Sequence, residues 1–355
     1  MGNIVIRYDR LKKYGTSQYL YKFLKIDSHC KFYFFIFIFY LCGLNSSQAS
    51  EDSLLETIWD IESGKVIKQE ELIEHFLGAE LIYLGEKHDN ARQHEIQLQI
   101  LEALIDKGKR PSIGFEFFTI GQTSLLMNFT QPSEPIMNIK SKDYDPESVL
   151  RQALGWDHHS DEEWSYYFKL IEFARDNQLP AFATDIPWGL SSRITRVGVE
   201  NLHPTELSLL LDTGLNDSEY EQLMLEEFTN VHCGYRNEEM FRRMYQAWIA
   251  RNDAIAQSIV NTLEANPQKP VVMIIGFGHL RHGMGIPERI AYLRPETKQI
   301  NFSMIEINLE PSSLESYLPE FEINGRTFKQ DFDYIWFTSR KDMEDPCKAF
   351  RKQSE

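Results

Sequence analysis

Four short apolar runs punctuate the middle of the chain, and each has the length and composition of a buried β-strand. Continuous apolar runs of this kind are typical of strands that are covered on both faces, as in a parallel sheet. Two of the runs end at a glycine, Gly85 and Gly276, where a tight turn or a close approach of the backbone to another group is easiest. The four runs occupy residues 81–84, 112–118, 180–185 and 271–275.

Between the runs, apolar side chains recur with the period of amphipathic helices. Strands that alternate with helices predict βα units, so the fold class is α/β, with a mostly parallel central sheet flanked by helices. Two later strands are expected at 301–308 and 334–338, the second as an antiparallel strand at an edge. The predicted helices cover residues 68–77, 90–107, 147–154, 161–177, 187–202 and 237–265, and another begins at Pro287.

The predicted domain organisation has three parts. Residues 50–310 form one α/β domain, in which the helices predicted around 204–235 are interpreted as an insertion that covers the site. Residues 311–355 are interpreted as a C-terminal extension. Residues 1–49 are a signal peptide or disordered leader.

The leader has the layout of a secretory signal. Lysines and arginines precede an apolar run at 32–41, which is too short to span a bilayer comfortably, and small residues follow at 47–49. This pattern predicts export, with an uncleaved membrane anchor or a buried strand as the alternatives. Cys30 and Cys42 belong to the leader. Cys233 and Cys347 remain, and they could pair in an oxidising compartment if their geometry allows it.

The composition narrows the possible partners. The chain has 355 residues, 42% of them apolar and 25% charged, which suits a globular fold with a large core. Its formal net charge of −16 argues against a nucleic acid or an anionic lipid surface as partner. Such acidity is compatible with a cationic or metal-containing ligand, although many acidic proteins are merely soluble.

Ionisable side chains lie in or directly after each apolar run. They are Glu86 and His88, Glu116, Asp185, and His279 with its neighbour His282. Because the carboxyl ends of parallel strands meet at one edge of a sheet, these side chains are expected to converge. A structural alternative exists for several of them. Glu116 could pair only with Arg251, Asp185 could cap the helix at Pro187, and His94 is expected to be a core histidine.

Several segments, in order along the chain, resemble the ChaN-like haem-binding family of the Tiki superfamily. The resemblance implies an α/β fold, an exported and often lipid-anchored setting, and haem held by a tyrosine with help from histidine at a dimer interface. Asp185 departs from the family pattern, which commonly has asparagine there, as does Trp188, where a basic residue is common. The resembling segments are 83–90 with His94, 114–118, 154–156, 183–187, Gln246 with 251–253, and 276–287.

The first functional hypothesis is an exported haem- or iron-binding protein of the periplasm or outer membrane, active in haem uptake. His88, Glu116, His279 and Arg281 are its predicted cofactor-binding residues. The partners implied are haem, a second copy of the chain and a membrane contacted through the N-terminal segment, with no nucleic acid. The tyrosine candidates for iron are Tyr144, Tyr166, Tyr167 and Tyr235.

The second hypothesis is a metal-dependent hydrolase acting on a small molecule or peptide, similar to the protease and erythromycin-esterase-like relatives in the superfamily. His88, Glu116 and His279 would hold a divalent metal ion, and Glu86 or Glu116 would act as general base for a metal-bound water. An interaction domain with a degenerate site is the third interpretation.

Overall fold

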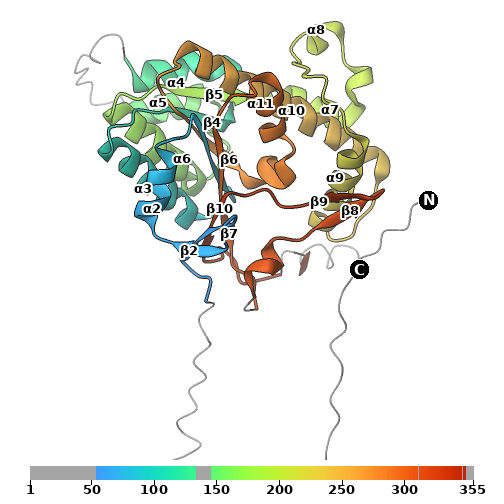
Figure 1. Ribbon diagram of the computed structural model, residues 1–355. Helices are drawn as coiled ribbons and strands as arrows, with labels where there is room; N and C mark the ends of the chain where they lie inside the picture. Colours follow the sequence, from blue (N-terminus) through green and yellow to red (C-terminus); the bar gives the residue numbers. More distant parts are fainter. Residues whose placement is uncertain (1–52, 133–144, 311, 346, 349–355) are drawn as a thin grey trace, which may run out of the picture.

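The structure is a computed structural model, and it describes residues 53–132, 145–310, 312–345 and 347–348 (Figure 1). Its centre is an eight-stranded sheet with the order β2-β1-β10-β7-β3-β6-β4-β5. Six neighbouring strands, β10 to β5 in that order, are parallel, and β1 and β2 form an antiparallel hairpin at one edge. The strands are β1 (Ile58–Asp60), β2 (Lys65–Ile67), β3 (Leu81–Glu86), β4 (Ser112–Thr119), β5 (Ala181–Asp185), β6 (Val271–Gly276), β7 (Gln299–Glu306) and β10 (Tyr334–Thr338).

Helices cover both faces of the sheet, which confirms the predicted α/β class. In Figure 1, α2, α3 and α6 lie on one side of the sheet, and α7, α9 and α10 lie on the other. The helices are α2 (Gln69–Phe76), α3 (Ala91–Asp106), α4 (Thr123–Thr130), α5 (Pro146–Ala153), α6 (Asp161–Asp176), α7 (Trp188–Val197), α8 (Pro204–Leu207), α9 (Ser218–Val231), α10 (Glu238–Ala265) and α11 (Ile286–Leu293).

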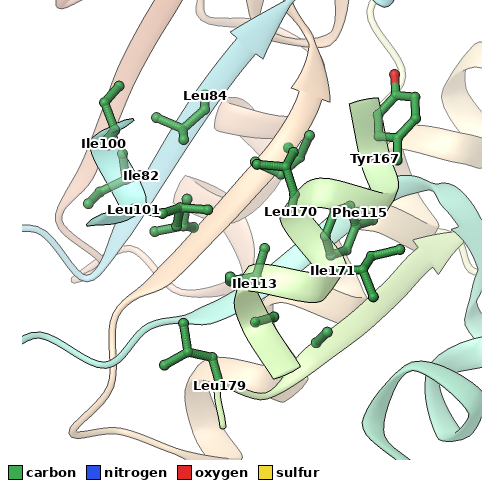
Figure 2. Close-up of a cluster of buried hydrophobic side chains, with 14 of the residues drawn as sticks. Ile82, Leu84, Ile100, Leu101, Ile113, Phe115, Tyr167, Leu170, Ile171 and Leu179 are labelled. Carbon is green, nitrogen blue, oxygen red and sulfur yellow. The ribbon is translucent and has the colours of Figure 1, made fainter. Parts of the chain in front are cut away.

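Strand β3 explains why the predicted strands are apolar without interruption. Ile82 and Leu84 pack against α3 and α6 in one apolar core cluster. Figure 2 shows part of this cluster. Leu81 and Tyr83, which alternate with them, pack on the other face against α10 and α11. Since successive side chains of a strand point to opposite faces, a sheet covered by helices on both sides needs apolar residues at every position.

The last strand differs from its prediction. Strand β10 is parallel to β7 and lies inside the sheet, with β1 on its other side. All five of its residues are buried. The expectation of an antiparallel edge strand was wrong because the β1–β2 hairpin occupies that edge, and its short strands gave only a weak pattern in the sequence.

Helices α8 and α9 occur where an insertion was predicted, but a separate insertion is not confirmed. Tyr220 and Leu223 of α9 share one apolar cluster with Tyr245 of α10. The same cluster includes Ile323 and Phe328, which belong to a small hairpin formed by β8 (Phe321–Ile323) and β9 (Arg326–Phe328). These helices therefore belong to the layer on the α10 side of the sheet. The domain boundaries at 50 and 310 stay predictions.

Cys233 and Cys347 form a disulfide, with their Cα atoms 5.5 Å apart, as their predicted pairing required. The bond ties the turn after α9 to the C-terminal segment. Cys30 and Cys42, the leader and Tyr144 lie outside the described residues. Within the described residues, no helix combines the length and apolar character needed to cross a bilayer.

Reduction of this disulfide is expected to destabilise the fold. The bond joins residues 114 positions apart, and closing such a loop restricts the unfolded chain by about 5 kcal/mol in the chain-entropy account. Thermal unfolding with and without a reductant measures the effect. A variant carrying Cys233→Ser and Cys347→Ser should be insensitive to reductant, whereas an unchanged melting temperature for the reduced native chain would contradict the prediction.

Candidate functional site

The strands β3, β6, β4 and β5 are neighbours in the sheet, and the predicted site residues gather where these strands end. Glu86 ends β3, Asp185 ends β5, and His279 lies in the short helix η3 (Phe277–Gly283) that directly follows β6. Glu116 lies in β4, one residue beyond Phe115, the last residue of β4 that pairs with β6. The expected convergence of these side chains is therefore observed.

Glu116 is the centre of this cluster and is 1% exposed. Its Oε1 accepts hydrogen bonds from Arg251 Nη2 (2.8 Å) and His279 Nε2 (3.1 Å), and its Oε2 accepts one from the backbone N–H of Gly276 (2.6 Å). Burial alone would raise the pKa of Glu116, but His279, His88 and Arg251 together lower it well below its usual value. The buried carboxylate is therefore ionised, and both of its oxygens accept hydrogen bonds.

His279 is held by a partner at each ring nitrogen. Since Glu116 is a carboxylate, His279 Nε2 must donate to it. Burial lowers the pKa of His279, so the ring is neutral and Nδ1 accepts a hydrogen bond. Asn252 Oδ1 lies 2.5 Å from Nδ1, while Asn252 Nδ2 is buried without a partner among the described residues. The reversed amide orientation, with Nδ2 at Nδ1, would satisfy both nitrogens. Trp248 stacks on the imidazole with centroids 3.9 Å apart.

Glu86 is the second buried carboxylate and is also 1% exposed. Its Oε1 accepts hydrogen bonds from the Tyr167 hydroxyl (2.6 Å) and His88 Nδ1 (3.2 Å), and its Oε2 accepts one from Gln97 Nε2 (2.5 Å). Burial raises the pKa of Glu86, but His94 and its hydrogen-bond donors outweigh burial and lower it below the usual value. Glu86 therefore presents a fixed negative charge to His88.

The side chain of His88 is more exposed than those of Glu86, Glu116, Asp185, Arg251 and His279. Its Nδ1 donates to Glu86, while Nε2 has no hydrogen-bond partner among the described residues, and the side chain is 49% exposed. Partial burial lowers the pKa of His88, but the hydrogen bond to Glu86 and the charge of Glu116 raise it above its usual value. Phe117 packs against the ring at a centroid distance of 4.5 Å. His88 can therefore offer Nε2 to a ligand.

Gly276 is required by the position of His88. A Cβ atom at Gly276 would lie 2.5 Å from His88 Cε1 and 3.2 Å from Glu116 Oε2. Gly276→Ala is therefore expected to displace the imidazole and to weaken ligand binding at this site by about tenfold or more, with a lower melting temperature. Gly121→Ala is the matched control, since a Cβ there meets no atom within 4 Å. Equal ligand affinities for the two variants would contradict this packing.

Asp185 and Glu116 share one cation, Arg251. Arg251 Nε donates to Asp185 Oδ2 (2.8 Å), and its Nη2 lies 2.8 Å from both carboxylates. Burial and the charge of Glu116 raise the pKa of Asp185 to about 6, against the opposing effect of Arg251. Glu116 does pair with Arg251, but not with Arg251 alone, because His279 and Gly276 also donate to it. The capping role of Asp185 is wrong. Among the described residues, Ile186 supplies the one backbone N–H from which its side chain accepts, and the cap of α7 is Pro187.

A protein-family model matches the part of the chain that contains this cluster. The family model described as haem-binding uptake, Tiki superfamily, ChaN matches residues 72–290. The chain belongs to this family. The matched range contains β3 to β6, η3 and every residue of the cluster, so the site lies within the part of the chain that the ChaN-like family shares.

A solved structure shows the same fold. ChaN of Campylobacter jejuni, solved for its cofacial haem binding, has a TM-score of 0.56 and 18% identity over 79% of this chain and 95% of its own. A mutant of the erythromycin esterase EreC, solved in its open conformation, is more distant, with a TM-score of 0.44 and 13% identity over 79% of this chain and 96% of its own. No curated protein sequence matches the chain.

Arg281 does not join the cluster of this ChaN-like chain. Its guanidinium pairs with Glu227 of α9 and contacts Gln330 at 3.4 Å. His282 faces the same region, with Nε2 3.5 Å from Glu227 and Nδ1 3.2 Å from the Lys329 carbonyl. The predicted contact of Arg281 with a cofactor stays a prediction, and the cation at the cluster is Arg251.

The predicted divalent metal site is not supported. Among the described residues, no group of three or more His, Cys, Asp and Glu side chains is placed to hold a metal ion. The physical reason lies in the partners of the predicted ligands. Glu116 and His279 are bonded to each other, and His279 Nδ1 is taken by Asn252. Only His88, of the three predicted ligands, keeps a nitrogen available.

Two of the four tyrosine candidates are poorly suited to ligate iron. The Tyr167 hydroxyl donates to Glu86, and burial raises its pKa well above the usual value. The Tyr166 hydroxyl donates to Glu162 (2.6 Å), and its pKa is raised to about 12, by burial and then by Glu162. Either tyrosinate would have to form beside a carboxylate. Tyr235 is 51% exposed, and its hydroxyl donates to no carboxylate among the described residues.

Four residues of the cluster lie on helices, so a search for polar residues at the ends of predicted strands could not find them. Asn252 and Trp248 lie on α10, Tyr167 lies on α6, and Gln97 lies on α3. Tyr167 was predicted as a candidate iron ligand and Asn252 lies in a segment that resembles the family, but no pattern in the sequence placed either of them beside Glu86 or His279. The one available signal was the polar interruption at 251–253 in the middle of the longest helix. His94 is buried and hydrogen-bonded at both ring nitrogens, as a core histidine should be.

Proposed function

We propose that this protein is an exported haem-binding protein that takes part in haem uptake, with His88 as a ligand of the haem iron. The observation that carries the proposal is the geometry of His88. Its Nε2 is free of described partners and half of its side chain is exposed, while Nδ1 donates to the buried carboxylate of Glu86. Membership of the haem-binding ChaN family supports the choice of haem.

The residues around His88 suit such a ligand. A histidine that donates its second nitrogen to a carboxylate is fixed in one tautomer and is a more basic ligand to iron. Phe117 beside the imidazole offers apolar surface to a porphyrin, and Arg251, which is 23% exposed, donates to Glu116. Haem would supply the iron and the porphyrin plane, while the chain orients His88 and excludes water from Glu86.

Export belongs to the same proposal. The basic stretch and apolar run of residues 1–49 have the layout of a secretory signal, and the disulfide between Cys233 and Cys347 suits an oxidising compartment such as the periplasm. Dimerisation around haem and membrane association through the N-terminal segment follow from the family resemblance. The metal-dependent hydrolase has less support, because Glu116 and His279 engage each other instead of facing a common ion.

Titration of the purified protein with haem tests the proposal. A saturable shift of the Soret band, at a fixed ratio of haem to protein and with a spectrum unlike that of free haem, is expected. A spectrum identical to that of free haem at every ratio would contradict haem binding. Size-exclusion chromatography of the protein with and without haem would show whether haem binding is coupled to dimerisation.

A further inference from the structure

Arg251 is fixed by two carboxylates but does not use all of its donors. A guanidinium carries five N–H groups. The Nε and Nη2 atoms of Arg251 face Asp185 and Glu116, while Nη1 has no partner among the described residues. The side chain is 23% exposed. One edge of the guanidinium is therefore held in place, and the other edge is available to a ligand.

Arg289 shows what a purely structural arginine looks like in the same fold. It is 1% exposed, and all three of its nitrogens are used. They donate to Asp253 (2.5 Å) and to the carbonyl oxygens of Gly285 (2.9 Å) and Leu215 (3.5 Å). Arg251 differs from Arg289 in both respects, since it keeps a free nitrogen and remains accessible.

Arg251 lies near enough to His88 for its charge to lower the pKa of that imidazole. Arg251 Nη2 and His279 Nε2 both reach Glu116 Oε1. On the other side of the same carboxylate, the position of a Cβ at Gly276 lies 3.2 Å from Glu116 Oε2 and 2.9 Å from His88 Nε2. The guanidinium and the imidazole therefore flank one buried carboxylate, so a single ligand of porphyrin size can reach both.

We propose that Arg251 binds an anionic carboxylate group of the ligand through Nη1, and that Asp185 is an internal carboxylate that competes for the same guanidinium. The inference rests on the proposed function, because it assigns a propionate of haem to this arginine. A charge-assisted pair of this kind is strong only when the cation is not already neutralised. Two carboxylates on one guanidinium leave the group with a net negative charge, which opposes an incoming anion.

The role of Asp185 follows from that charge balance. Glu116 is needed to hold Gly276 and His279, whereas Asp185 bonds only to Arg251 and to the N–H of its own neighbour Ile186. Removing the charge of Asp185 leaves one carboxylate on Arg251 and a neutral pair. The ligand anion then meets a more available guanidinium.

The experiment compares haem with haem dimethyl ester, which has the same porphyrin and iron but no carboxylates, in titrations of the full chain. The wild-type protein is expected to bind haem about tenfold or more tightly than the ester. Arg251→Met should bind the two porphyrins equally, and Asp185→Asn should bind haem several-fold more tightly with little change for the ester. Arg242→Met, which removes a more exposed arginine of the same helix, should behave as wild type.

The outcomes separate the two proposals. If neither porphyrin binds the wild-type protein, haem binding and this inference both fail. If both bind equally well, haem binding stands and the role of Arg251 is refuted. A preference for haem that survives in Arg251→Met refutes it as well. Should Arg251→Met fold poorly, Asp185→Asn decides, since an unchanged ratio of the two affinities in that variant contradicts the competition.

Discussion

His88→Ala is expected to abolish the haem-specific Soret band, or to weaken haem binding by about a hundredfold or more. The variant removes the one nitrogen of the cluster that is free to ligate iron. Glu86→Gln keeps the imidazole but replaces its carboxylate partner, and loss of such a partner is expected to weaken binding by about 10- to 100-fold. Absorbance titrations of the three proteins measure both effects.

The control is His75→Ala, which removes an exposed histidine at the end of α2. This variant should bind haem as the wild-type chain does. If His88→Ala and His75→Ala give the same spectrum and affinity as the wild-type chain, another residue ligates the iron. Tyr235, which is exposed, would then become the first candidate among the described tyrosines.

Asp185→Asn is expected to change the pH dependence of stability. Burial, the charge of Glu116 and the opposing Arg251 leave the pKa of Asp185 at about 6 in the folded protein, compared with 3.8 as its ordinary value. Because the folded state holds this proton more tightly, the resulting stabilisation is fully present below about pH 4 and is lost as the pH rises to 6. Asparagine does not titrate, so it does not undergo this loss.

The free energy of unfolding of Asp185→Asn should therefore rise relative to wild type by about 2.4 kcal/mol between pH 4 and pH 7, and the difference should then stay level. Urea denaturation over this pH range provides the measurement. Asp157→Asn, at an exposed position, serves as the control. If the free energies of unfolding of Asp185→Asn and wild type differ by the same amount at every pH, the pKa of Asp185 is not raised in the folded state.

The position of the site could be predicted from the sequence because the core of a parallel sheet admits few polar residues. Leu81 to Leu84 and Val271 to Ile275 are buried on both faces, so the ionisable residues that follow them mark the strand ends. Parallel topology then brings these ends to one edge, and Glu86, Glu116 and His279 meet there. The disulfide was foreseen by simple elimination of the leader cysteines.

The contacts within the site could not be predicted, because they depend on geometry that the sequence pattern does not encode. Arg281 is two residues from His279, yet it faces α9, since the chain turns at Arg281 and at His282, whose φ is +64°. Arg251, far from His279 along the chain, reaches Glu116 because of the rotation of α10 about its axis. The same rotation places Asn252 and Trp248 against the imidazole of His279 and so removes it from the possible metal ligands.

The most direct test of this account is a crystal structure of the protein grown with haem. The account predicts that iron is bonded to Nε2 of His88, while Nδ1 of the same ring still donates to Glu86. Iron ligated by other residues with His88 Nε2 left free, or haem bound away from the ends of β3 and β6, would contradict it.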